Sequence, residues 1–209
     1  MYQKYIKRGL DIIISLVVIF VLWPLLLVIA FLVRIKLGKP VLFSQVRPGY
    51  KGKLFKLYKF RTMTNTCDEF GNLLPANERT TTFGSILRST SLDELPEIVI
   101  NVLRGEMSLI GPRPLAQQYL PYYTPEEMRR HDVLPGLTGL AQVYGRNNLS
   151  WEKRFEYDIK YVDHISFKMD MSIFIQTLLK IVKRSDIIDT RKGCEENFDV
   201  YRKRQNGRK

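Results

Sequence analysis

Residues 12–33 read IIISLVVIFVLWPLLLVIAFLV, an uninterrupted apolar stretch without a charged residue. As a straight helix this stretch would be about 33 Å long, which is sufficient to cross the hydrocarbon core of a bilayer. It is too long for the apolar region of a signal peptide, and no cleavage site of small residues follows it. The sequence therefore predicts a membrane helix in this part of the chain.

Two features of the apolar stretch bear on how it enters the membrane. Basic residues flank it on both sides: Lys4, Lys7 and Arg8 before it, and Arg34, Lys36 and Lys39 after it. Because cytoplasmic segments carry the excess of Lys and Arg, this symmetry favours a hairpin whose two ends stay in the cytoplasm. Pro24 lies at the centre, where it removes a helical hydrogen bond and permits a sharp bend. A kinked helix that crosses the membrane once is the alternative, since proline is common in membrane helices.

The remainder of the chain has the composition of a basic, folded domain outside the membrane. The 209 residues are 45% hydrophobic and include 33 Lys and Arg against 21 Asp and Glu, a net charge of +12. The length argues against a TIM barrel, and the hydrophobic content argues against a disordered chain. Two separated cysteines argue against a disulfide scaffold, and two histidines are too few for a His-rich zinc site. The positive charge requires an anionic partner: a nucleic acid, a phosphorylated substrate or an anionic membrane face.

Short secondary-structure elements follow the apolar stretch. Residues 41–46 and 54–60 have strand character, and the Gly-containing turn between them predicts a β-hairpin. Apolar residues at helical spacing predict helices over residues 95–103, 125–132, 151–162 and 169–182. The apolar sides of the last two helices either pack in the core or lie flat on the membrane. From residue 187 the chain is polar and ends in basic residues, which predicts a loosely ordered tail.

Asp93 and Glu94 are adjacent acids close to the predicted start of a helix. Ser91 and Glu94 also match the S-x-x-E capping box, although Pro96 favours a helix that begins just before the proline. A helix N-terminus stabilises carboxylates and attracts phosphate. One acid could therefore attack phosphorus while the other holds a divalent cation, and simple helix capping is the alternative.

Two further segments carry candidate binding residues. Arg113 stands between two prolines, and this stiff frame suits an arginine that binds phosphate in a bidentate manner. A later glycine-rich stretch holds Gln142 and Arg146, where backbone amides could approach a nucleotide. Neither a Walker A motif nor G-x-G-x-x-G is present, so a standard nucleotide-binding fold is not expected. His131 is expected to be a surface or capping residue rather than a general base.

Four motifs occur in order along the chain: KFRTM at residues 59–63, SLDELP at 91–96, NVLRGEMSLIGPRP at 101–114 and PGLTGLAQV at 135–143. Together with the basic-flanked apolar stretch, they resemble the bacterial sugar transferases, the monotopic phosphoglycosyl transferases. The resemblance extends from the apolar stretch to about residue 184. It is greatest to the small members of the family, such as the enzymes that initiate bacterial N-linked protein glycosylation.

The resemblance implies an activity and a site. Family members transfer a sugar 1-phosphate from a UDP-sugar to polyprenyl (undecaprenyl) phosphate and release UMP, using Mg²⁺ and a covalent aspartyl intermediate. Carried over to this sequence, Asp93 would be the nucleophile and Glu94 would bind Mg²⁺. The residues that would bind phosphates, support the acidic site or lie near the nucleotide are Lys59, Arg88, Arg113, Gln142 and Arg146.

The resemblance also implies a fold and a location. The expected fold is α+β and helix-rich, with a re-entrant membrane helix over residues 1–40, a catalytic domain over 41–186 and a polar basic tail over 187–209. The catalytic domain would contain a short β-hairpin and interfacial amphipathic helices. It would face the cytoplasm and contact the lipids of the inner membrane.

The sequence departs from the family pattern at two positions. Trp23-Pro24 stands where the family often has a Ser-Pro pair, whose hydroxyl can bond the carbonyl that proline frees. Four residues separate Pro96 from Asn101, where three are expected. The extra residue predicts a bulge in the helix that follows the acid pair.

Two other classes of protein fit part of the sequence. A membrane-anchored nucleic-acid binder would suit the basic charge, but the aromatic residues do not alternate with basic ones as in a stacking platform. No nucleic-acid partner is therefore expected. A membrane-tethered scaffold without turnover would leave the acid pair and the stiffly held arginine unexplained. The sequence predicts neither the identity of the UDP-sugar nor an oligomeric state.

Overall fold

The computed structural model describes residues 2–145, 149–183 and 196–207. The principal elements are, in chain order, α1 (Lys7–Lys36), β1 (Leu42–Pro48), β2 (Leu54–Phe60), α2 (Ala76–Arg79), α3 (Thr82–Ser89), η3 (Leu92–Glu94), η4 (Glu97–Val102), β3 (Ser108–Ile110), η5 (Gln117–Tyr122), α4 (Pro125–Met128), η6 (Arg129–His131), β4 (Gly136–Thr138), α5 (Leu140–Tyr144), α6 (Trp151–Asp163), α7 (Phe167–Lys183) and α8 (Phe198–Asn206). In this described part, helices dominate and the strands form two small sheets. The expected α+β, helix-rich fold is confirmed.

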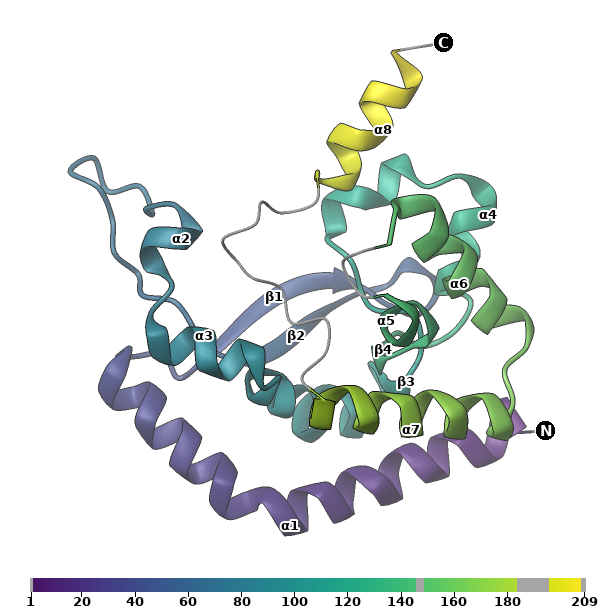
Figure 1. Cartoon of the computed structure of the whole chain (residues 1–209), viewed down its shortest axis with the longest axis horizontal. Helices are drawn as coiled ribbons and strands as arrows, with labels where there is room; N and C mark the ends of the chain where they lie inside the picture. The colour runs from purple at the N-terminus through teal and green to yellow at the C-terminus, as the bar shows by residue number, and fades with distance from the viewer. Residues whose placement is uncertain (1, 146–148, 184–195, 208–209) are drawn as a thin grey trace.

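Helix α1 is bent at its middle, and the other elements lie on its concave side (Figure 1). Pro24 lies inside the helix, where a missing hydrogen bond permits a bend. Both arms pack against the domain, since Asp11 and Ser15 are buried on one arm and Ile29 and Val33 on the other. Large apolar side chains are exposed along the helix: Ile13, Leu16, Val17, Phe20, Val21, Trp23, Leu25, Leu27, Val28, Phe31 and Ile35. Within the described ranges, α1 is the one helix long and apolar enough to cross a membrane.

Polar contacts attach the N-terminal arm of α1 to the domain. Lys7 Nζ forms an ion pair with a carboxylate oxygen of Asp170, in α7, at 2.6 Å. Arg8 donates to the carbonyl oxygens of Val102 at 2.6 Å and Leu103 at 3.0 Å, at the end of η4. The basic residues before the apolar stretch therefore fix this arm of the helix to the domain.

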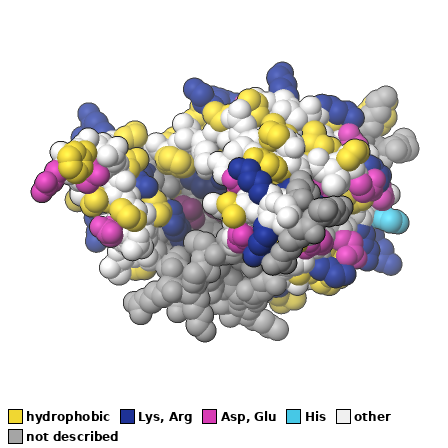
Figure 2. Space-filling view, turned by 90° about the horizontal axis from the view of Figure 1, so that it is seen from above, with side chains coloured by type: hydrophobic (Ala, Val, Ile, Leu, Met, Phe, Trp, Pro, Cys, Tyr) yellow, Lys and Arg dark blue, Asp and Glu magenta, His cyan; other side chains and the backbone are white. Residues whose placement is uncertain are grey.

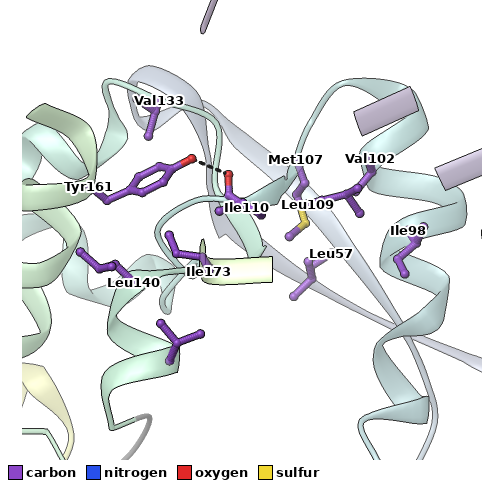
Figure 3. Packing of buried hydrophobic residues seen from close by; sticks show 11 residues of the cluster. Leu57, Ile98, Val102, Met107, Leu109, Ile110, Val133, Leu140, Tyr161 and Ile173 are labelled. Carbon is purple, nitrogen blue, oxygen red and sulfur yellow. Dashed lines mark hydrogen bonds between the residues drawn. The ribbon is translucent and has the colours of Figure 1, made fainter. Parts of the chain in front are cut away.

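Strands β1 and β2 form the expected antiparallel hairpin, with Leu42 opposite Phe60 and Pro48 opposite Leu54. A second sheet pairs β3 with β4 in parallel. A cluster of buried apolar side chains joins the strands to the helices (Figure 3): Leu57, Ile98, Val102, Met107, Leu109, Ile110, Val133, Leu140, Val143, Tyr161 and Ile173. The Tyr161 hydroxyl in this cluster lies 3.1 Å from the carbonyl oxygen of Ile110, so its polar atom has a partner.

The two helices expected near residues 151–182 bury their apolar sides to different extents. Helix α6 buries Trp151, Phe155 and Tyr161, so its apolar side packs in the core. Helix α7 buries Ile173 but leaves large apolar side chains exposed: Phe167, Met171, Ile175, Leu178 and Leu179. Helix α7 therefore keeps an apolar face outside the protein core.

The described part of the C-terminal tail corrects the expectation of a loosely ordered segment. Helix α8 buries Phe198 completely within a cluster of aromatic side chains: Tyr119, Tyr123, Trp151 and Phe155. Trp151 Nε1 also donates to the carbonyl oxygen of Glu196 at 3.0 Å. Phe198, together with the packing of Tyr201 and the ion pair of Arg202 with Glu127, thus anchors a segment whose average composition is polar.

His131 also differs from the expected surface position. Only 6% of its surface is exposed, and its ring centre lies 5.5 Å from that of Tyr123. Burial, together with the charge of the neighbouring Arg130, lowers the pKa of His131 to about 4. The imidazole is therefore neutral at physiological pH and belongs to the core.

Candidate active site

The acid pair lies in the 3₁₀ turn η3, between α3 and η4. Ser91, just before the turn, has a positive φ of 57°, and its side chain makes no capping hydrogen bond. The capping interpretation of Ser91 and Glu94 is therefore wrong. A left-handed conformation costs a non-glycine residue about 1 kcal/mol, and such strained residues concentrate at functional sites. The turn directs the Glu94 side chain toward β2 and toward the loop after β3, where its partners lie.

Two cations from distant parts of the chain hold Glu94. Lys59 Nζ, at the end of β2, lies 2.6 Å from Glu94 Oε1. Arg113 donates to both carboxylate oxygens, with a short contact to Oε1 and a longer one of 3.4 Å to Oε2. Burial acts to raise the pKa of Glu94, but Arg113 and Lys59 outweigh it and hold the pKa well below its usual range. Glu94 is therefore an anion at physiological pH.

Asp93 has a different environment, although it is the adjacent residue. It is 8% exposed, and no hydrogen bond or ion pair from the described residues reaches its carboxylate. Burial and the charge of Glu94 raise the pKa of Asp93 to about 6, while Lys59, Arg88 and Arg113 act against the rise. Asp93 is thus a desolvated carboxylate that no side chain of the described residues pairs with, an arrangement suited to nucleophilic attack.

Arg88 lies at the end of α3 and faces the loop that follows β2. Its Nε donates to Thr62 Oγ1 at 2.9 Å. Helix α3 approaches this loop so closely that a Cβ on Gly84 would lie 1.8 Å from the carbonyl oxygen of Thr62. Gly84 therefore permits the packing that places Arg88 near the acid pair.

Close backbone packing fixes the loop that carries Arg113. Strand β3 leads into Gly111, whose N–H donates to the carbonyl oxygen of Thr138 at 2.8 Å. A Cβ on Gly136 or on Gly139 would lie 2.1 Å from a backbone atom of Gly111. The glycine-rich stretch therefore serves close packing against the loop of Arg113.

A buried ion pair supports the same loop, and the sequence interpretation did not identify it. Arg130 Nη2 and Asp158 Oδ2 are 2.7 Å apart, and each side chain is 2% exposed. Arg130 Nη2 also donates to the carbonyl oxygen of Arg113 at 2.7 Å. No sequence motif marks this pair, because one member is in η6 and the other in α6.

The helix after the acid pair contains the expected bulge. Residues Glu97–Val102 form a π-helix, η4, which accommodates the extra residue before Asn101. The buried Asn101 side chain donates from Nδ2 to the carbonyl oxygen of Lys56 at 2.7 Å. Its Oδ1 accepts from the N–H of Tyr58 at 3.1 Å. The bulge thus brings Asn101 against β2, the strand that supplies Lys59.

The structure brings Lys59 and Arg113 into contact with Glu94 of the acid pair, whereas it does not do so for Gln142. Gln142 is folded back on its own loop, where its Nε2 donates to the carbonyl oxygen of Leu137 at 3.1 Å. Arg146 lies outside the described residues. The contacts of Gln142 therefore do not connect it with the acids.

A divalent cation at this site would have to be held mainly by one protein carboxylate. Across residues 2–145, 149–183 and 196–207, no three acidic, His or Cys side chains are grouped as a metal site. Glu94 Oε2 is the more weakly held oxygen, because Arg113 contacts it at 3.4 Å, and the Arg113 side chain is 42% exposed. Mg²⁺ commonly takes one or two carboxylates and completes its coordination with water and substrate phosphates. The residues present fit a Mg²⁺ ion that binds together with a phosphorylated substrate.

The surface above the site suits an anionic substrate. Figure 2 shows a hollow between the arm that carries α2 and the body of the molecule, with both basic and acidic side chains inside it. Helix α3, which carries Arg88, lies at the base of this arm (Figure 1). An anion that enters the hollow therefore meets positive charge.

Known proteins resemble this chain over most of its length. The model of a family described as bacterial sugar transferase matches residues 2–184. The uncharacterized sugar transferase EpsL of Bacillus subtilis is 52% identical over 166 residues, which cover 79% of this chain and 82% of that protein. The UDP-glucose:undecaprenyl-phosphate glucose-1-phosphate transferase of Klebsiella pneumoniae is 42% identical over 184 residues, or 83% of this chain and 39% of that protein. The UDP-N-acetylgalactosamine-undecaprenyl-phosphate N-acetylgalactosaminephosphotransferase of Aeromonas hydrophila is 35% identical over 186 residues, or 85% of this chain and 44% of that protein. The chain thus spans less than half the length of the last two relatives.

Proposed function

Because the chain belongs to the bacterial sugar transferase family, we propose that it transfers a sugar 1-phosphate from a UDP-sugar to polyprenyl phosphate and releases UMP. One observation carries this proposal: Asp93 is a buried carboxylate whose pKa is raised to about 6, beside a Glu94 whose charge is held by cations. When the surroundings of two adjacent acids move their pKa values in opposite directions, the two acids can take different roles in catalysis. The names of two relatives, which specify undecaprenyl phosphate, support the same reaction.

The proposed reaction consists of two displacements at one phosphorus atom. A carboxylate oxygen of Asp93 attacks the phosphorus that bears the sugar, and the bond from this phosphorus to the oxygen of UMP breaks. UMP leaves, and the sugar phosphate remains as an acyl phosphate on Asp93. An oxygen of the polyprenyl phosphate then attacks the same phosphorus, the bond to Asp93 breaks, and the carboxylate is restored. Both nucleophiles are anions, so neither step requires a general base.

Basic residues bind the phosphates in this scheme. Arg113 contacts both oxygens of a carboxylate in the absence of substrate, a bidentate geometry that a phosphate matches. Arg88 supplies a second positive charge near Asp93. Lys59 keeps the Glu94 carboxylate in place. Gln142 and Arg146 are assigned to substrate binding only by the resemblance to the family.

Glu94 would hold Mg²⁺ through the carboxylate oxygen that Arg113 contacts at the longer distance. The cation would neutralise the charge on the phosphates during transfer. Glu94→Ala should therefore lose most of its rate together with the dependence of the rate on Mg²⁺. A variant that loses only the Mg²⁺ dependence and keeps the rate would contradict the metal role.

Helix α1 enters the membrane as a re-entrant helix with both ends on the cytoplasmic side. The bend in α1, its exposed apolar side chains and the packing of both arms against one domain support this arrangement. The exposed apolar side of α7 rests on the membrane surface. The catalytic domain then meets the phosphate of its lipid acceptor at the inner membrane without crossing it.

Release of UMP from a panel of UDP-sugars tests the proposed activity. The panel contains UDP-glucose, UDP-galactose, UDP-GlcNAc, UDP-GalNAc and UDP-diacetylbacillosamine. At least one of them should yield UMP at a rate that depends on added polyprenyl phosphate. A nucleic-acid binder or a scaffold would release UMP from none of them.

A second experiment tests the nucleophile. Incubation with a labelled UDP-sugar and no acceptor should leave labelled sugar phosphate on the wild-type protein and none on Asp93→Asn. A full yield of adduct on Asp93→Asn would exclude Asp93 as the nucleophile.

A further inference from the structure

Glu97 is a third acid close to the acid pair, and the proposed mechanism gives it no role. It is the first residue of η4 and is only 2% exposed. An acidic side chain buried this deeply is unfavourable unless a cation or a hydrogen-bond donor accompanies it. The partner of Glu97 therefore indicates what the residue does.

That partner is Lys59, which Glu97 shares with Glu94. Lys59 Nζ lies 3.2 Å from Glu97 Oε1 and 2.6 Å from Glu94 Oε1. Because Arg113 also pairs with Glu94, the charges alternate along a row of four side chains: Glu97, Lys59, Glu94 and Arg113. Burial and the negative charge of Glu94 raise the pKa of Glu97. Glu97 Oε1 has no hydrogen-bond partner among the described residues, so the ion-pair contact with Lys59 is what accompanies this buried acid.

The backbone that connects Glu97 to Lys59 is held firmly. Asn101, in the same π-helix, bonds the backbone of β2 on both sides of Leu57, two residues before Lys59. Asn101 Nδ2 also donates to Glu106 Oε2 at 2.7 Å. The bulged helix thus binds the backbone of β2 through one side chain and the Lys59 ammonium through another.

We propose that Glu97 is a positioning residue that holds the Lys59 ammonium against Glu94 and so keeps the Glu94 carboxylate beside Asp93. This inference rests on the proposed transferase function. Without Glu97, Lys59 would keep only Glu94 and water as partners, and its flexible side chain could turn away from the site. Because Glu97 is not assigned to the reacting atoms, its effect passes through Lys59.

Substitutions of Glu97 in the full-length enzyme test the inference. Glu97→Leu should lower kcat for UMP release by about tenfold, because a misplaced Lys59 ammonium slows the chemical step. KM for the UDP-sugar should change by less than about twofold, because Glu97 is not assigned to substrate binding. Glu97→Gln keeps an oxygen that accepts from Lys59 and should retain kcat within about threefold. Glu156→Gln, which alters an exposed acid paired with Lys153 on α6, is the control and should leave kcat unchanged. An equal loss in the Gln and Leu variants would overturn the inference.

A double-mutant cycle with Lys59→Met separates positioning from a general effect on the fold. Once residue 59 is methionine, Glu97→Leu should cause no further loss in kcat or in Tm, because the interaction that it removes is already gone. Additive losses in either quantity would show that Glu97 acts independently of Lys59. The Tm measurement requires no turnover. Measurement of Tm therefore tests the coupling between Glu97 and Lys59 even if the wild-type protein releases no UMP. A lack of UMP release would refute the proposed function, and it would leave the result of the Tm measurements unaffected.

Discussion

Arg130 donates a hydrogen bond to the carbonyl oxygen of Arg113 at 2.7 Å while its guanidinium is paired with Asp158. The pair is almost completely buried, so it connects α6 to the backbone of the loop that carries Arg113. The arginine assigned to phosphate binding therefore depends on two charged residues that lie behind it in the core. Prolines on both sides of Arg113 restrict the backbone, and Arg130 fixes where that restricted backbone lies.

Removal of one member of this pair should destabilise the protein strongly. Arg130→Met or Asp158→Leu leaves the other charge buried without its partner, which costs about 3–5 kcal/mol in the free energy of unfolding. Denaturant unfolding of the purified protein measures this loss. The double variant Arg130→Met/Asp158→Leu should be more stable than either single variant, because it contains no unpaired buried charge. Single variants as stable as the wild type would contradict the assigned role.

The rate of adduct formation should rise with pH and level off above about pH 6. Burial and the charge of Glu94 raise the pKa of Asp93 to about 6. Because the attacking form is the carboxylate, the reactive fraction falls about tenfold for each pH unit below that pKa. Single-turnover release of UMP across this range measures the profile. Glu94 does not titrate in the same range, because its pKa is held well below the usual value. A rate that is independent of pH would exclude a raised pKa at the nucleophile.

His131 should make the protein less stable in mild acid. Burial lowers the pKa of His131 from 6.5 to about 4. Between these two pH values His131 binds a proton in the unfolded chain but stays neutral in the folded protein. Stability is therefore unaffected above about pH 6.5 and is lost progressively as the pH falls toward 4, by up to about 3 kcal/mol. Thermal unfolding at several pH values measures the slope. His131→Phe, which cannot be protonated, should flatten the profile over this interval, and an unchanged slope would assign the acid sensitivity to other groups.

Both ends of α1 should be accessible from the cytoplasmic side of the membrane. Single cysteines introduced as Gln3→Cys and Lys39→Cys, with Cys67→Ser and Cys194→Ser as background, should both react with an impermeant maleimide in inside-out vesicles. Neither should react in intact spheroplasts. A protein that retains only Cys67, which is exposed on the domain, is the control for the cytoplasmic side. Labelling of residues 3 and 39 from opposite sides would establish a single crossing and refute the re-entrant arrangement.

Secondary-structure features that depend on residues close together in the sequence could be predicted without the structure. The period of the apolar residues identified α6 and α7, and the turn between two alternating segments identified the β1–β2 hairpin. The count of residues before Asn101, compared with the spacing expected from the resemblance to the family, predicted the π-bulge, because an inserted residue in a packed helix must be accommodated locally. The polar average composition of the tail did not predict helix α8, which packs through the buried Phe198 and is held further by Tyr201 and Arg202.

The sequence by itself thus determined a long apolar helix with a central proline, the hairpin and the place of the acid pair just before the start of a helix. Only the tertiary structure decided that the two adjacent acids differ in character. Desolvation raises the pKa of Asp93, whereas Glu94 is held as an anion by Lys59 and Arg113, which lie 35 and 19 positions away. It also decided that Lys59 lies between Glu94 and Glu97 and that Arg130 lies behind Arg113. The physical reason is that burial and charge act through space, so the pKa of a carboxylate depends on side chains that only the fold brings near it.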